Sequence, residues 1–228
     1  AEPLQLRELE QCVAWLERIG EAARVAGDRP RWLRCWRDRA LLLIGFWRAF
    51  RSDELCRLRV EHIQARAGEG LRLFLPWSKS DRDNQGQSFS APALVRLCPV
   101  QAYLDWIEVA EVTNGPVFPG IDRWGHLSKQ ALHPHSVIPL LRAVLHGAGL
   151  PAVLYSSHSL RRGFATWATF NGWDIKALMG YVGWRDTKSA LRYVESTGSF
   201  PGQLHPLMPG LEVEFRPGLS DLTTPPGG

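Results

Sequence analysis

Residues 39–55 read RALLLIGFWRAFRSDEL and contain the longest uninterrupted apolar run of the chain, Ala40 to Trp47. Together with the mixed polar and apolar residues before it, this run predicts a helix over about Trp32 to Phe50 with a strongly apolar core. The run is far shorter than the roughly 18 residues that a helix needs to cross a bilayer. It is therefore typical of the core of a globular domain.

The polar end of the same stretch predicts a second, short helix. Ser52 is a residue type that caps helix N-termini, and Asp53 and Glu54 would lie in the first turn, where the helix dipole favours negative charge. Arg51 is thereby expected at the joint between two helices, where a side chain can be held rigidly.

Helical spacing of apolar residues recurs in several other segments. These run from about Leu4 to Ala26, Pro99 to Val112, His135 to Gly147, His158 to Phe170, Asp174 to Tyr181 and Asp186 to Val194. Asp174 and Asp186 are expected to cap the helices that they begin.

Between Ile63 and Pro92 the pattern changes to the alternation of short strands. Apolar residues at 71, 73 and 75 alternate with Arg72 and Phe74, and a polar stretch over residues 78–86 follows. We expect a small antiparallel sheet with a loose hairpin tip, and a loop over Gly115 to Ser128. The predicted fold class is mainly α with a small antiparallel β-sheet (α+β).

Composition favours one globular domain, because 45% of the residues are hydrophobic and 22% are charged. We expect this domain over residues 1–196. Residues 197–228 are rich in Pro and Gly and read as a tail, in which Leu211 to Phe215 could add one edge strand. Four cysteines without a CxxC pair, and no secretory signal segment, predict reduced thiols and a cytoplasmic protein.

The positive charge is carried almost entirely by arginine. All but four of the 27 basic residues are Arg, and the net charge is +4. A planar guanidinium suits phosphate oxygens, so an anionic partner such as nucleic acid is plausible, although high genomic GC content would also favour Arg. Four arginines of the second predicted helix either contact a DNA backbone or, as the safer interpretation, solvate the helix: Arg31, Arg34, Arg37 and Arg39.

Several short segments together resemble the catalytic domain of the tyrosine recombinase, or phage integrase, family. In chain order they are Arg51 to Leu55, Ser78 to Asp81, His158 to Gly163, Gly183-Trp184, and Tyr193 nine residues after Trp184. No single piece is specific, but the ordered set, spanning about Leu4 to Glu195, is strong support for the resemblance.

The chemistry of these residues suits an attack on a phosphodiester. His158 and Arg161 lie three apart near a predicted helix N-terminus, where both can face one anion. Arg51 would add a second guanidinium to neutralise the charge that builds up on the non-bridging phosphate oxygens. Each residue also has a plainer interpretation: a buried histidine, a solvated arginine, and a salt bridge from Arg51 to a neighbouring acid.

Glu54 and Lys79 complete the predicted acid and base groups. Glu54 would repel a phosphate, so it is expected to orient Arg51 or the His158 region, and the resemblance gives it the acidic position of the family motif. Lys79 is either an ordinary charged turn residue or, as the resemblance implies, the general acid that protonates the departing 5′ oxygen.

Trp184 and Tyr193 are the last two candidate catalytic residues. Trp184 stands where most family members carry His; its indole N–H can donate a hydrogen bond but cannot shuttle protons, and a core role is also open. Tyr193 is the expected nucleophile because, unlike Tyr155 and Tyr181, it keeps the family spacing after Gly183-Trp184. Its phenol, with an ordinary pKa near 10, would need nearby cations or His158 to assist deprotonation.

The resemblance implies strand exchange through a 3′-phosphotyrosyl link on double-stranded DNA, by a homotetramer on paired sites and without ATP, metal or other cofactor. Two alternatives are type IB topoisomerase-like relaxation and a non-catalytic DNA-binding relative. Histidines that could suggest zinc lack Cys or acidic companions at ligand spacing, so no metal site is expected among them: His126, His133, His135 and His146. Family members usually carry an N-terminal DNA-clamping domain, whose absence here suggests a domain fragment; the tail could dock in cis or on a neighbouring subunit.

Overall fold

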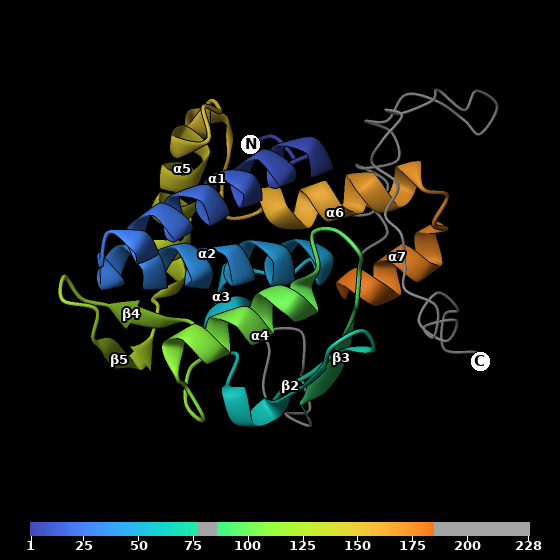
Figure 1. The fold of residues 1–228 in the computed structure, drawn as a ribbon. Coiled ribbons are helices and arrows are strands. Elements are labelled where there is room, and N and C mark those ends of the chain that lie inside the picture. Colours follow the sequence, from blue (N-terminus) through green and yellow to red (C-terminus); the bar gives the residue numbers. More distant parts are fainter. Residues whose placement is uncertain (77–85, 185–228) are drawn as a thin grey trace.

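The structure is a computed structural model, and it describes residues 1–76 and 86–184 (Figure 1). Its helices are α1 (Leu6–Val25), α2 (Arg29–Trp47), α3 (Ser52–Cys56), α4 (Pro99–Ala110), α5 (Val137–Gly147), α6 (Ser159–Phe170) and α7 (Ile175–Val182). Its strands are β1 (Ile63–Arg66), β2 (Gly70–Leu75), β3 (Gln87–Pro92), β4 (Pro119–Ile121) and β5 (Leu127–Ala131). Short 3-10 turns cover Val60–His62, Pro134–Ser136 and Ala152–Leu154.

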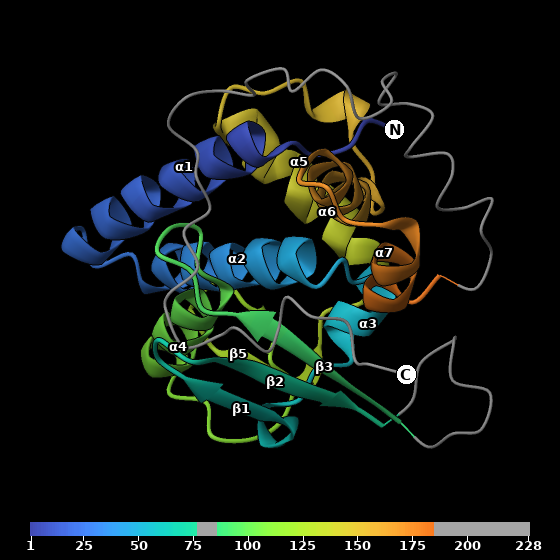
Figure 2. The same ribbon diagram turned by 90° about the vertical axis from the view of Figure 1, so that its right-hand side faces the viewer.

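Helix α2 forms the centre of the molecule, as its apolar run predicts. Every residue from Ala40 to Phe50 is buried. Figure 2 shows α2 between α1, α5 and α6 on one side and α4 with the three-stranded sheet on the other, and α2 contacts α1, α4 and α6 directly. Asp28 caps its start by accepting from the N–H of Arg31 at 3.1 Å.

Of the four arginines considered on α2, Arg31 is exposed, in line with a solvated face. The other three contact protein, and Arg39 pairs with Glu17 and Asp105. Arg37 is buried, where it pairs with Asp38 and donates to the Pro119 carbonyl at 3.1 Å. Arg34 donates to the carbonyls of Ile121 and Asp122 at 3.3 and 2.7 Å. Burial of Asp38 raises the pKa of its carboxyl, although the Arg37 guanidinium opposes that rise. Arg34 and Arg37 therefore attach α2 to the β4 region through hydrogen bonds and do not form a solvated face.

The predicted sheet is confirmed in the antiparallel order β1-β2-β3. Leu71, Leu73 and Leu75 are buried, whereas Arg72 and Phe74 are exposed, so the alternation in sequence matches the two faces of β2. The sheet packs its buried face against α4 and the end of α2. The hairpin tip, with Lys79, lies outside the described residues.

A second small sheet replaces part of the loop that we expected over Gly115 to Ser128. Strands β4 and β5 pair antiparallel, with Ile121 opposite Leu127. Asp122 closes the turn between them by accepting from the N–H groups of Trp124 and His126. The loop prediction was wrong because these short strands lack regular apolar alternation, so their pairing depends on this turn and on contacts with α2. The fold class, mainly α with small antiparallel sheets, is confirmed.

The N-terminal residues lie along the start of α6. Leu4 is fully buried, and its N–H donates to the Ser159 carbonyl at 3.0 Å. Gly163 of α6 allows this approach, because a Cβ at that position would overlap the Leu4 carbonyl. Residues 1–5 are therefore part of the packing around α6.

Asp174 caps α7, as predicted, by accepting from the N–H of Ala177 at 2.9 Å. The expected helix over Asp186 to Val194 and the tail over residues 197–228 lie outside the described residues. All four cysteines are free thiols. Across residues 1–76 and 86–184, no helix has both the length and the apolar character to span a membrane.

Candidate active site

Arg51 lies at the predicted helix joint, between the end of α2 and the start of α3. The expectation that Ser52 caps α3 was wrong: Arg51 is the N-cap and Ser52 is the first helical residue. The backbone N–H of Arg51 donates to Oε2 of Glu54 at 2.7 Å, so the glutamate supplies the cap acceptor three residues into the helix. Nη1 of Arg51 donates to Oε1 of the same carboxylate at 2.9 Å. Because 33% of the Arg51 side chain remains exposed, its guanidinium can still meet an anion from solvent.

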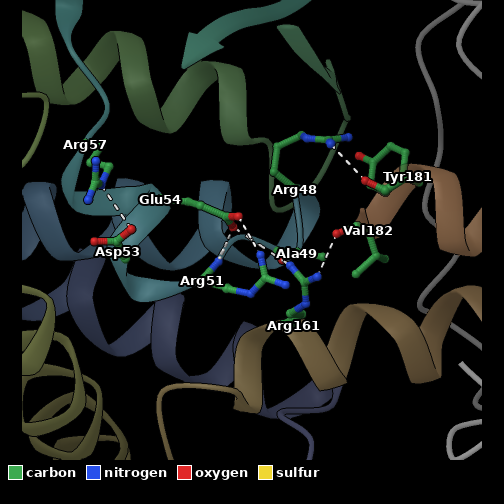
Figure 3. A network of polar contacts seen from close by, with 9 residues as sticks. All are labelled: Arg48, Ala49, Arg51, Asp53, Glu54, Arg57, Arg161, Tyr181 and Val182. Atoms are coloured by element: carbon green, nitrogen blue, oxygen red, sulfur yellow. Dashed lines mark hydrogen bonds and ion pairs between the residues drawn. The ribbon is translucent and has the colours of Figure 1, made fainter. Parts of the chain in front are cut away.

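Arg161 lies in the first turn of α6 and is buried. Its Nη1 donates to the Ala49 carbonyl at 2.8 Å, and its Nη2 donates to the Val182 carbonyl at 2.7 Å. Nη1 also lies 3.8 Å from Oε2 of Glu54. One guanidinium thus joins segments that follow α2, begin α3 and end α7 (Figure 3).

The turn at Ala49 sets the direction of the carbonyl that Arg161 contacts. Ala49 adopts a left-handed conformation with φ 52°. The N–H of Phe50 donates to the Gly45 carbonyl and that of Ala49 to the Phe46 carbonyl, which is the Schellman arrangement that ends many helices. A residue other than glycine in this conformation costs on the order of 1 kcal/mol. The hydrogen bond from Arg161 helps to offset that cost.

Glu54 is the buried carboxylate of the site, with 5% of its surface exposed. It contacts Arg51 and Arg161 together, so two guanidiniums face one carboxylate and the cluster keeps an excess of positive charge. Its position matches the expectation that it orients Arg51 rather than binding an anion itself. A role for Glu54 in a reaction stays a prediction.

His158 is the N-cap of α6, one residue before the helix begins, and its side chain is exposed. Its pKa is lowered from 6.5, first because nearby protein atoms displace water from the ring, and then because Arg161, Arg51 and Arg162 repel a further positive charge. Two of these guanidiniums, those of Arg161 and Arg51, belong to the cluster around Glu54. The neutral ring is the form that can accept a proton.

Trp184 follows the end of α7. Gly183 takes a left-handed conformation with φ 72°, and the N–H of Trp184 donates to the Met179 carbonyl at 2.9 Å. The indole is partly buried, and its ring centre lies 5.7 Å from Cζ of Arg161. Trp184 is therefore adjacent to the cationic cluster, as its place in the sequence predicts.

Lys79 and Tyr193 lie outside the described residues, so their predicted roles stay predictions. The segments that carry them leave the described part of the chain after β2 and after α7. Arg48, a residue that the sequence analysis did not single out, contacts both β3, which follows the Lys79 segment, and α7. The signal that could have identified it is a charged residue placed between the buried aromatic residues Trp47 and Phe50.

The histidines considered for a metal site do not form a cluster of metal ligands in the described part of the chain. His126 contacts Asp122, and the rings of His133 and His135 lie against each other. Within residues 1–76 and 86–184, no group of three or more His, Cys, Asp or Glu side chains is arranged to hold a metal ion.

Comparisons with known proteins identify related sequences. The sequence profile of the phage integrase family matches residues 33–199. The chain is 32% identical over 166 residues to an integrase/recombinase xerD homolog of Selenomonas ruminantium, which is 72% of this chain and 48% of that protein.

Solved structures with a similar fold include two recombinases. XerH site-specific recombinase, in a post-cleavage complex with palindromic difH substrate, matches with a TM-score of 0.64 and 18% identity over 86% of this chain and 50% of that chain. XerA recombinase matches with a TM-score of 0.57 and 17% identity over 85% of this chain and 58% of that chain. At such identities the likeness concerns the fold alone.

The chain spans about half the length of the relatives that it matches. The family profile nevertheless covers most of the chain, including the helix joint at Arg51 and the start of α6. On this sequence match, the chain belongs to the phage integrase family.

Proposed function

We propose that this chain is the catalytic part of a DNA strand transferase, a site-specific recombinase that cuts and rejoins DNA through a 3′-phosphotyrosyl intermediate. The observation that supports this most directly is the pairing of Arg51 and Arg161 with the Glu54 carboxylate, in a cluster whose guanidiniums also lower the pKa of His158. A compact cluster with excess positive charge suits a phosphodiester, because negative charge on the phosphoryl oxygens increases as a nucleophile attacks. XerH was solved with DNA in pre- and post-cleavage complexes, which supports duplex DNA as the partner here.

In the proposed first step, the phenol oxygen of Tyr193 attacks phosphorus and the bond from phosphorus to the 5′ oxygen breaks. The phenol proton passes to His158, whose lowered pKa keeps the ring neutral and able to accept it near neutral pH. Lys79 gives a proton to the departing 5′ oxygen. The strand end is then joined to Tyr193 through its 3′ phosphate.

In the second step, a free 5′ hydroxyl of a partner strand attacks the phosphotyrosyl phosphorus, and each proton transfer runs in reverse. The energy of the broken phosphodiester is kept in the phosphotyrosyl bond, so the proposed reaction uses neither ATP nor a metal ion. Exchange between strands requires paired sites, for which we propose a homotetramer. Arg51 and Arg161 stabilise the charged oxygens in both steps, and Trp184 adds one N–H donor.

Covalent capture tests this proposal. Nicked duplexes drawn from a genomic library lose the short strand after cleavage, so the phosphotyrosyl adduct accumulates and survives SDS. Wild-type protein should form the adduct, and Tyr193→Phe, which loses only the nucleophilic oxygen, should not. If Tyr155→Phe rather than Tyr193→Phe abolishes the adduct, the nucleophile is assigned wrongly.

Products separate recombination from related activities. Captured sites placed as pairs on a plasmid should yield exchanged junctions. Relaxation of supercoils without exchanged junctions would indicate a topoisomerase, and DNA binding without any adduct would indicate a non-catalytic relative.

A further inference from the structure

Arg48 is a buried cation at the C-terminal end of α2, with 5% of its surface exposed. Its guanidinium carbon lies 3.9 Å from the ring centre of Tyr181, 5.0 Å from that of Phe89 and 5.7 Å from that of Phe50. In the described part of the chain, no carboxylate pairs with it. Burial of an unpaired charge is costly unless hydrogen bonds and aromatic rings compensate for the lost water, so this arginine is an unusual choice for a core position.

The hydrogen bonds of Arg48 connect two elements that approach the site from different directions. Nη1 donates to the Ser90 carbonyl of β3 at 3.1 Å, and Nη2 donates to the Tyr181 carbonyl of α7 at 3.1 Å. Strand β3 begins just after the segment that carries Lys79, whereas α7 ends just before Trp184 and the segment that carries Tyr193. Arg48 itself is only three residues before Arg51 in the sequence.

Arg48 and Arg161 hold consecutive carbonyls at the end of α7. The last carbonyls of a helix have no partner within the helix and carry the negative end of its dipole. Here the Tyr181 carbonyl accepts from Arg48, and the Val182 carbonyl accepts from Arg161 (Figure 3). The chain leaves α7 at Gly183 directly after these two contacts, so they fix the point from which the following segment departs.

We propose that Arg48 is a positioning residue for strand cleavage. With Arg161 it fixes the end of α7, and through Ser90 it ties that end to the strand that follows the Lys79 segment. In this role Arg48 helps to position both the nucleophile Tyr193 and the general acid Lys79, and it does not itself contact DNA. This inference rests on the proposed function and assigns to Arg48 a role in its rate.

Arg48→Met separates positioning from folding, because methionine keeps an unbranched side chain in the aromatic surroundings and removes the buried charge. The variant relieves the buried charge but also removes the donor to the Ser90 and Tyr181 carbonyls, and these two changes act in opposite directions on stability. Urea unfolding therefore measures the folded fraction of Arg48→Met, and rates are compared between folded proteins. The matched control is Arg34→Met. Arg34 also lies on α2 and also donates to two backbone carbonyls, but these belong to the β4 region.

The measurement is the single-turnover rate of adduct formation at saturating nicked DNA, beside the Kd for the same duplex. Arg48→Met should lower the rate about 10- to 100-fold, because a displacement near 1 Å of a reacting group can cost about 10²-fold. Its Kd should stay unchanged, and Arg34→Met should match wild type in both. Arg48→Lys, which can donate to one carbonyl at a time, should give an intermediate rate and provides the test if Arg48→Met does not fold.

The outcomes test the positioning role of Arg48 separately from the proposed function. If wild type forms no adduct with any nicked DNA, the proposed function fails. If wild type forms the adduct and Arg48→Met cleaves at the wild-type rate, the positioning role is overturned. A loss of rate that only parallels weaker DNA binding or a smaller folded fraction overturns it as well.

Discussion

The Glu54 carboxylate binds Arg51 twice, at the backbone N–H and at the guanidinium. The same carboxylate therefore starts helix α3 and orients a candidate phosphate ligand. Its second oxygen lies near Arg161, which comes from a distant part of the chain. Stability and the geometry of the site consequently depend on one side chain.

Replacement of Glu54 by Ala should lower the free energy of unfolding by about 3 kcal/mol, because it leaves buried positive charge without its carboxylate and removes the N-terminal cap of α3. Urea unfolding followed by circular dichroism measures this. Asp53→Ala is the matched control, since the Asp53–Arg57 pair is partly exposed and should contribute less than about 1 kcal/mol. Equal losses in the two variants would contradict a special role for Glu54.

Acid should destabilise the protein through His158. The pKa of His158 in the folded protein lies below 6.5, so on acidification the unfolded chain binds the proton first. The stability that this group contributes is complete above about pH 6.5 and is lost as the pH falls through the folded pKa. The Tm difference between His158→Gln and wild type should therefore shift in favour of the variant from about pH 8 to about pH 5.

Arg162→Gln provides an independent check on the same group, because it removes one of the positive charges that act on His158. The His158 resonance in NMR titrations should then show a higher pKa than in wild type. A pKa at or above the ordinary value in wild type, or no change in the variant, would contradict the electrostatic account of this site.

Two glycines of the neighbouring helices α6 and α7 should respond oppositely to alanine. Gly163→Ala forces a methyl group into the Leu4 carbonyl and should cost about 1–3 kcal/mol. Gly180→Ala meets open space in the interior of α7 and should stabilise by about 0.5–1 kcal/mol. Thermal unfolding compares the pair; a stabilised Gly163→Ala would show that residues 1–5 do not pack on α6.

Lys79→Ala should slow cleavage of ordinary DNA by about 10²- to 10⁴-fold if this lysine is the general acid. A substrate with sulfur in place of the bridging 5′ oxygen needs no protonation of its leaving group, because a thiolate leaves readily. The variant should cleave that substrate within about tenfold of wild type. Absence of this rescue would assign the proton to another group.

Helix α2 follows from the sequence because its long apolar run is buried on all sides. Strand β2 follows because its apolar residues alternate with the period of a strand, so they alone determine which face is buried. The cap of α3 was assigned to Ser52 by residue type. The glutamate three residues into the helix instead determines the boundary, because its carboxylate reaches back to Arg51.

The inner part of the site was not predictable from side-chain patterns. Arg161 binds the carbonyls of Ala49 and Val182, and Arg48 binds those of Ser90 and Tyr181. Every residue has a carbonyl, so nothing in the sequence marks these acceptors. Their positions follow from the left-handed turn at Ala49 and from the packing of α7, which depend on tertiary contacts.

The placement of residues 1–5 along α6 makes this segment a sensitive site for protein engineering. A protease cut between Leu4 and Leu6 would remove no candidate catalytic group, yet it would free the Leu4 backbone that packs on Gly163, two residues after Arg161. Labels attached to side chains of residues 1–5 should therefore disturb the start of α6, where Arg161 lies.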